Sequence, residues 1–304
     1  MNFKEQFDAE YGFAQDVVRR LAVIEEKGYQ SIVMEAMNYS ILAGGKRLRP
    51  IFMHSVFSAL NGDENRMPEV ECFMAAIELI HTYSLVHDDL PAMDNDELRR
   101  GKPTTHVKYG EDMAILAGDA LLNRAFETAS KAFGFCKSEE DLKCTGAAFS
   151  ILSGKAGIYG MVGGQVYDVL AEKKNLELDE EKLLFIFRLK TAALIEASMM
   201  IGAVLAGASE ETVSAVRKIA EKIGIAFQIR DDLLDVYGSE EELGKPVGSD
   251  ERNNKTTYVT LKGIEQSEKD VQAYSDEALR SVAVLFGEEG FLYSLSKSLV
   301  GRRS

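Results

Sequence analysis

Residues that break helices are scarce in this chain, and this scarcity limits its fold more than any other feature. Only five prolines occur in 304 residues, tryptophan is absent, and Ala, Leu, Glu and Lys are abundant. Apolar residues recur at helical spacing along most of the chain, whereas strand-like alternation is rare. The sequence therefore predicts one all-α domain over residues 1–304, built as a helical bundle with a site between facing helices.

Turn and helix signals place the individual helices. Gly44–Gly45 end one predicted helix, and Pro50 suits the first turn of the next. The apolar run Met67–Leu90 predicts a helix that stops before Pro91, while Arg100–Thr104 (RGKPT) predicts a polar loop. Further helices are predicted over residues 112–134, 141–170, 178–206, 211–237 and 265–287.

Charge and apolar patterning exclude several classes of function. The net charge is −14, with 49 acidic and 35 basic residues, which disfavours nucleic acids and anionic membranes as partners. The most apolar stretch, Ala192–Ala208, is about 17 residues long and contains Glu196, so it predicts a buried or subunit-interface helix and no membrane span. The three cysteines form no CxxC pair, and the N-terminal residues lack the apolar segment of a signal peptide. We therefore expect a cytoplasmic protein.

Two acidic clusters adjoin apolar helical runs. Their members are Asp88, Asp89, Asp94, Asp96 and Glu97 in HDDLPAMDNDELRR, and Asp231, Asp232 and Asp235 in FQIRDDLLD. Asp231 and Asp235 lie one helical turn apart, about 6 Å, and carboxylates so placed repel each other unless a cation lies between them. Oxygen ligands suit Mg²⁺ or Mn²⁺, and Mg²⁺ often shares substrate phosphates. The clusters predict a metal-bridged phosphate site, with a solvated acidic face as the alternative.

Basic residues lie close to these acidic clusters in the sequence. They are Lys46, Arg47 and Arg49 in GGKRLRP, Arg99, Arg100, Lys190 before Thr191, Lys245 and Lys255. Such cations in an acidic protein fit a polyanionic ligand held by both metal and Lys/Arg, although each residue alone could be a surface charge. His81, Ser84 and Asp88 are spaced i, i+3, i+7, so His81 is either a substrate contact or a structural histidine.

Six motifs occur in the order found in trans-isoprenyl diphosphate synthases. They are GGKRLRP, HTYSLVHDDLPAMDNDELRRGKPTTH, GGQVYD, RLKT, FQIRDDLLD and GKPVGSDERNNKTTYV. Over about residues 40–260 the sequence resembles this family, and it is most similar to the bacterial farnesyl diphosphate synthase branch. Four residues separate Asp89 from Asp94, as in the bacterial short-chain enzymes, and the second motif is an unmodified DDxxD.

The resemblance implies a role for many of these residues. It implies three Mg²⁺ ions, replaceable by Mn²⁺, held by Asp88, Asp89, Asp94, Asp231, Asp232 and Asp235. It implies allylic diphosphate binding by Arg99, Lys190, Thr191, Gln228, Lys245 and Lys255, and isopentenyl diphosphate binding by Lys46, Arg49, His81 and Arg100. Gln165 and Asp168 would lie near the metals, and Arg302 and Arg303 would help to close the site.

The resemblance also implies an isoprenoid synthase-type bundle, a homodimer and a reaction. Dimethylallyl or geranyl diphosphate would condense with isopentenyl diphosphate to give farnesyl diphosphate and pyrophosphate. Tyr83, with Ser84 beside it, would form the closed end of the hydrocarbon tunnel and limit the product to C15. A helical wheel places Tyr83 about 140° from Asp88, so this role is implied by the resemblance and not by periodicity.

Several alternatives stay open. A geranyl (C10) or geranylgeranyl (C20) diphosphate synthase would carry the same motifs, and a non-catalytic partner subunit would usually have degraded ones. A terpene cyclase does not need GGKRLRP, because it binds no second diphosphate. An acidic bundle that buffers Ca²⁺ leaves the ordered cations unexplained, and the chain has no EF-hand, HExxH, GxSxG or GxxxxGK[ST] motif.

Overall fold

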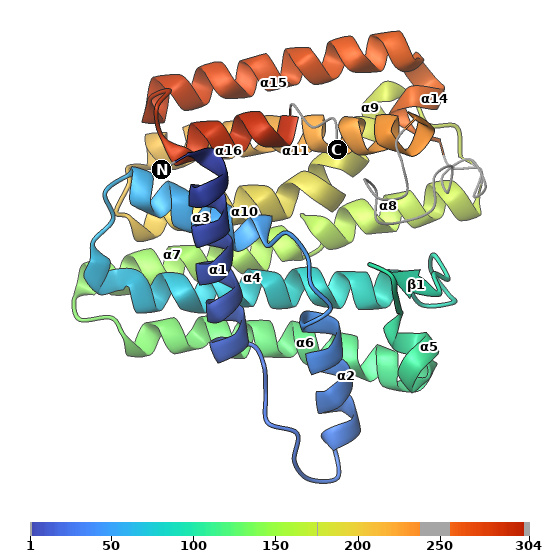
Figure 1. The fold of residues 1–304 in the computed structure, drawn as a ribbon, viewed down its shortest axis with the longest axis horizontal. Coiled ribbons are helices and arrows are strands. Elements are labelled where there is room, and N and C mark those ends of the chain that lie inside the picture. The colour runs from blue at the N-terminus through green and yellow to red at the C-terminus, as the bar shows by residue number, and fades with distance from the viewer. Residues whose placement is uncertain (1, 175, 238–255, 301–304) are drawn as a thin grey trace.

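Helices make up nearly all of the regular structure in the computed structural model, which describes residues 2–174, 176–237 and 256–300 (Figure 1). This confirms the predicted all-α class. The first part of the chain forms α1 (Phe3–Leu21), α2 (Ser31–Ile41), α3 (Leu48–Ala59), the short 3₁₀ helix η1 (Glu64–Arg66) and α4 (Met67–Asp88).

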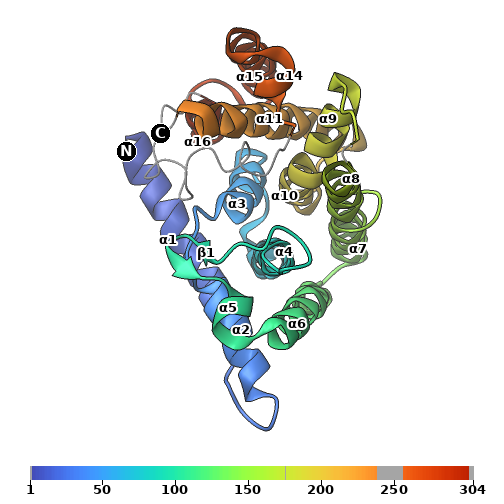
Figure 2. The ribbon, with the colours of Figure 1, turned by 90° about the vertical axis from the view of Figure 1, so that its right-hand side faces the viewer.

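Helix α4 runs through the middle of the bundle (Figure 2). Its buried side chains, among them Val70, Phe73 and Ile77, point in all directions around the helix, which is the pattern of a helix surrounded by others. It packs mainly against α6 (Glu111–Ser130) and α3. The predicted stop before Pro91 is confirmed, because α4 ends at Asp88.

The predicted loop over Arg100–Thr104 is partly wrong, because a small hairpin forms there. Strands β1 (Leu98–Arg99) and β2 (Lys102–Pro103) pair antiparallel. Arg100 and Gly101 make the turn with φ of 53° and 71°, the positive values that a two-residue hairpin turn requires. The hairpin leads into α5 (Thr105–Tyr109), α6 and the 3₁₀ helix η2 (Lys131–Gly134).

The predicted helix over 141–170 is wrong, because the structure has two helices there. They are α7 (Glu139–Ala156) and α8 (Met161–Lys173). Gly157 ends α7 in an extended conformation, and a Cβ on Gly160 would come within 2.0 Å of the Lys155 carbonyl oxygen. Helical apolar spacing continues across this break, so periodicity alone did not reveal it.

The predicted helix over 178–206 is continuous but irregular in its middle. It comprises α9 (Glu180–Ile186), a π-helical segment η3 (Phe187–Ala192) and α10 (Ala193–Leu205). Segments of π-helix are rare and often occur at functional sites. Helix α10 is buried against α3, α7 and α11 (Glu210–Tyr237). Among the helices of the described residues, none has the length and apolar character needed to cross a membrane.

The C-terminal helices cover one side of the bundle. They are α14 (Tyr258–Lys262), α15 (Ile264–Phe286) and α16 (Phe291–Val300), and α15 lies along α11 (Figure 1). The predicted helices over 211–237 and 265–287 are therefore confirmed. A second, smaller core joins α9, η3, α11, α14 and α15, with the fully buried Tyr258 at its centre.

Candidate active site

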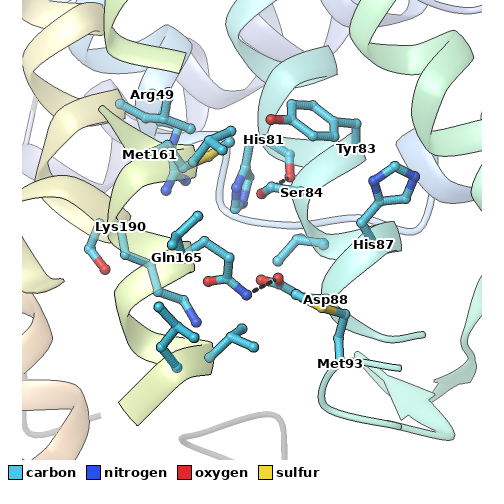
Figure 3. A pocket seen from close by; sticks show the side chains of 17 residues that line it. Arg49, His81, Tyr83, Ser84, His87, Asp88, Met93, Met161, Gln165 and Lys190 are labelled. Carbon is cyan, nitrogen blue, oxygen red and sulfur yellow. Dashed lines mark hydrogen bonds between the residues drawn. The ribbon is translucent and has the colours of Figure 1, made fainter. Parts of the chain in front are cut away.

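A cavity of about 580 Å³ opens between α4, α8 and the η3–α10 junction (Figure 3). Its walls are mostly apolar, while a few polar and charged side chains gather around Asp88, Gln165 and Lys190. Cavities that combine apolar walls with a few convergent polar groups are typical of small-molecule sites.

Helix α4 supplies one wall of this cavity. His81, Ser84 and Asp88 all line it, which confirms that their i, i+3, i+7 spacing places them on one side of the helix. Tyr83 also lines the cavity and is only 7% exposed. The cavity therefore extends around α4 beyond the side of the helix that carries Asp88. The Tyr83 ring meets the His87 ring edge-on, with 5.9 Å between the centroids.

Asp88 stands at the polar end of the cavity. The Gln165 side-chain amide of α8 donates a hydrogen bond of 2.5 Å to Asp88 Oδ1. Burial raises the pKa of Asp88 to about 6; Lys190 opposes this rise, and Asp94 adds to it. A carboxylate in such surroundings gains stability from any nearby cation.

The other aspartates of the first cluster differ in their surroundings. Asp89 is 3% exposed and accepts a hydrogen bond of 2.7 Å from Arg99 Nε. Burial raises the pKa of Asp89, while its hydrogen bond with Arg99 opposes that rise. Asp94 is exposed, and its backbone N–H donates to the Asp88 carbonyl oxygen at 2.9 Å, so the loop curls back over the end of α4.

The second acidic cluster takes part in a chain of hydrogen bonds. Thr191 Oγ1 of η3 donates to Gln228 Oε1 of α11 at 2.8 Å, and Gln228 Nε2 donates to Asp232 at 3.2 Å. The other carboxylate oxygen of Asp232 accepts from the backbone N–H of Tyr258 at 2.8 Å. Asp232 therefore ties α11 to α14, while Asp235 is also buried and Asp231 is partly exposed.

Lys190 projects from the π-helical segment into the cavity (Figure 3). Its Nζ lies 2.6 Å from Asp168 Oδ2 on α8. A Cβ on Gly164 would lie 2.2 Å from the Lys190 backbone nitrogen, so only glycine lets α8 approach η3 this closely. Asp168 of the GGQVYD motif and Lys190 of the RLKT motif are thus brought together, a pairing that the sequence did not predict.

Lys46, Arg49 and Arg100, together called the cation cluster, lie beside His81 on the α3 side of the cavity. Arg49 and His81 line the cavity, and Arg100 donates to the Gly44 carbonyl oxygen from the hairpin turn. Burial lowers the pKa of Arg49 to about 10. Burial and the nearby Arg49 and Arg100 hold the pKa of His81 well below its usual value, so this imidazole is neutral at pH 7. Lys46 is exposed on the same turn.

The donor set near Asp88 suits a hard cation. It consists of carboxylate and amide oxygens, which are the ligands that Mg²⁺ prefers. Within the described residues, no three His, Cys, Asp or Glu side chains converge on one point. Mg²⁺ commonly keeps several waters and shares substrate phosphates.

Some predicted residues lie outside the described residues, and the sequence reasoning missed others. Lys245, Lys255, Arg302 and Arg303 lie outside the described ranges. The missed residues form much of the apolar wall: Leu85, Met93, Met161, Val162, Val166, Val169, Leu170 and Leu194. The i, i+4 spacing of the α8 members, around the polar Gln165, was a signal that could have found them.

Comparisons with known proteins agree with this geometry. The family model described as "Polyprenyl synthetase" matches residues 30–283. The farnesyl diphosphate synthase of Bacillus subtilis is 42% identical over 288 residues, covering 94% of each chain. The chloroplastic geranylgeranyl pyrophosphate synthase of Catharanthus roseus is 45% identical, covering 83% of this chain and 68% of the relative. The Helicobacter pylori geranyltransferase, solved with magnesium and isoprenyl diphosphate, superposes with a TM-score of 0.81 at 34% identity over 96% of each chain. The chain therefore belongs to the polyprenyl synthetase family.

Proposed function

We propose that this protein is a magnesium-dependent prenyltransferase that joins an allylic diphosphate head-to-tail to isopentenyl diphosphate. One observation carries the proposal. A single cavity holds Asp88, Gln165 and Lys190 at one end and an apolar wall beyond them, which matches a molecule with a diphosphate head and a hydrocarbon tail.

The acidic side chains take the allylic diphosphate together with Mg²⁺. Asp88, Asp94 and Asp231 would hold the metal, which when bound stabilises the negative charge that develops on the pyrophosphate leaving group. Lys190 adds a fixed positive charge at the same end of the cavity. The carbon–oxygen bond of the allylic substrate breaks, leaving an allylic carbocation, and the apolar walls keep away water that would capture it.

The cation cluster holds the second substrate without metal. Arg49, His81, Arg100 and Lys46 would bind the diphosphate of isopentenyl diphosphate, so its double bond faces the carbocation at close range. The new carbon–carbon bond forms, and a proton then leaves the product. None of the described side chains is an obvious base for this proton, so we assign the proton to the released pyrophosphate.

Farnesyl diphosphate is the product that Tyr83 favours. Its ring is bulky, buried and part of the cavity wall, where it would limit the growing chain to C15. The Bacillus subtilis relative is named a farnesyl diphosphate synthase, and the Catharanthus roseus relative supports a C20 product as the second candidate.

We further propose a homodimer formed through α6, α7 and α8, which lie along one side of the molecule (Figure 2). Large apolar side chains are exposed there, including Ile115, Leu116 and Leu142. Exposed apolar residues gathered on one face mark interaction surfaces, and most homo-oligomers pair identical faces.

One assay tests the proposed reaction. The protein is incubated with dimethylallyl and isopentenyl diphosphates, with Mg²⁺ or with EDTA, and the products are separated by chromatography. We expect a C15 diphosphate with Mg²⁺ and no product with EDTA. No condensation under either condition would refute the proposal, and a C20 product would favour the second candidate.

A further inference from the structure

Arg47 lies between Lys46 and Arg49 in the GGKRLRP motif, yet its side chain is held inside the protein. It is 4% exposed, and each guanidinium nitrogen has a protein partner. Nη1 lies 2.7 Å from Glu78 Oε2, Nε donates to Gln15 Oε1 at 2.8 Å, and Nη2 donates to the Ile41 carbonyl oxygen at 2.6 Å. Because all three nitrogens are engaged, Arg47 is not available to a substrate.

The backbone of this turn is held in an unusual conformation. Gly44 and Gly45 have φ of 100° and 122°. Arg47 has φ of 49° and ψ of 32°, in the left-handed region that residues other than glycine rarely adopt. Arg47 is also the N-cap residue that precedes α3, and no side chain caps that helix end. The hydrogen bonds of the Arg47 side chain therefore stabilise a turn conformation that the backbone of Arg47 alone would disfavour.

The turn that Arg47 fixes carries the cation cluster. Glu78 precedes His81 by one helical turn on α4, so the Arg47–Glu78 pair joins the turn to the helix beneath the cluster. Arg49 follows two residues later, and Arg100 donates to the Gly44 carbonyl oxygen in the same turn. The side chains of Arg47 and Glu78 are only 2% and 3% exposed, so water screens this pair little.

We propose that Arg47 is a positioning residue for isopentenyl diphosphate. With Glu78, Gln15 and the Ile41 carbonyl it sets the Gly44–Arg49 turn, so that Lys46, Arg49 and Arg100 converge on one diphosphate. This inference rests on the proposed function, which assigns that substrate to the cation cluster. It predicts that Arg47 affects the binding of isopentenyl diphosphate and not that of the allylic diphosphate, because Asp88, Gln165 and Lys190 at the allylic end of the cavity are held by other contacts.

The test compares variants of the pair with a matched control. Arg47→Met breaks the pair, Gln15→Met removes one bond as a milder change, and Arg47→Met/Glu78→Met removes both buried charges. Lys155→Met is the control, because Lys155 pairs with the buried Glu196 between α7 and α10 and does not line the cavity. The KM for each substrate, kcat and the melting temperature are measured for each variant.

We expect Arg47→Met to raise the KM for isopentenyl diphosphate about tenfold or more, because misplaced binding groups cost affinity. The KM for dimethylallyl diphosphate should change less than about twofold, and kcat less than about threefold. Gln15→Met should raise the KM for isopentenyl diphosphate by a smaller factor and also leave the KM for dimethylallyl diphosphate nearly unchanged. Lys155→Met should lower the melting temperature without changing either KM selectively. The double variant should recover stability, because apolar pairs often replace buried ion pairs well, but it should keep the raised KM.

The proposal would be overturned if Arg47→Met and Gln15→Met each changed the KM values of the two substrates by the same factor. It would also be overturned if the KM of the double variant for isopentenyl diphosphate returned to the wild-type value. Hydrogen exchange of the 43–49 amides provides a measurement that does not depend on activity. Arg47→Met should speed exchange there and leave α15 unchanged, and unaltered exchange would also overturn the proposal. A wild-type protein that makes no product would refute the proposed function, while this exchange measurement would still show whether Arg47 orders the turn.

Discussion

Gln165 and Asp88 are 77 positions apart in the chain, yet their side chains meet at 2.5 Å at the polar end of the cavity. The amide of Gln165 donates to Asp88 Oδ1, and the second oxygen of a carboxylate can accept a further partner. This contact joins α4 to α8 at the polar end of the site and orients the aspartate that we assign to the metal.

We predict that Gln165→Met raises the Mg²⁺ concentration that gives half-maximal activity. A hydrogen bond to a charged group contributes about 1.5–3 kcal/mol, so a loss of roughly tenfold or more in kcat/KM should accompany it. A magnesium titration of steady-state rates measures both effects. Gln272→Met is the control, because Gln272 bonds to Asp276 on the exposed side of α15. The same magnesium dependence in both variants would contradict the assignment.

We predict that Asp88→Ala and Asp231→Ala each lower turnover by roughly 10²-fold or more, because each removes charge stabilisation from the leaving group. Asp88→Ala should not lower the free energy of unfolding at pH 7, since burial already disfavours the Asp88 charge. Single-turnover rates and urea unfolding of each variant provide the measurement, with Asp276→Ala as the control. Near-normal turnover would remove that residue from the metal-binding set.

We predict that Tyr83→Ala shifts the product from C15 toward C20, because the smaller side chain deepens the apolar part of the cavity. Product chromatography after incubation with excess isopentenyl diphosphate measures the shift. Tyr109→Ala on α5, which removes a ring that meets the Tyr39 ring of α2 edge-on, should leave the product unchanged. Identical products from both variants would show that Tyr83 does not limit chain length.

We predict that Leu116→Glu converts a dimer into monomers, because a buried charge at an apolar interface is costly. Light scattering should give twice the 33.6 kDa chain mass for the wild type and a single chain mass for the variant. Val284→Glu is the control, since Val284 is 90% exposed on α15, away from the proposed interface. A wild-type mass equal to one chain would refute the dimer.

We predict that His81 makes folding sensitive to pH below about 6.5. Burial and the nearby arginines lower the pKa of His81 in the folded protein, so the unfolded chain gains a proton that the folded one does not. Stability is therefore complete above the unfolded pKa, and falls by up to about 1.4 kcal/mol per pH unit below it. Urea unfolding at pH 7.5 and 5.5 should show a smaller loss for His81→Asn than for the wild type. Equal losses would mean that His81 titrates normally.

Much of this molecule followed from short-range sequence patterns. Helical spacing located α4, α11 and α15 within a few residues, and placed His81 and Asp88 on one side of α4. Pro91 marked where α4 ends. These features depend on backbone preference and on spacing within a single helix, which neighbouring residues determine.

The tertiary structure decided how these parts combine. The break at Gly160 and the reach of Tyr83 into the cavity both depend on how closely neighbouring helices pack. Arg47 shows the difference most clearly. Its neighbours in GGKRLRP suggest a phosphate-binding cation, but its side chain is buried in an ion pair with Glu78. A buried charge takes its role from whichever partner packing brings within hydrogen-bond distance, and that partner lies 31 residues away.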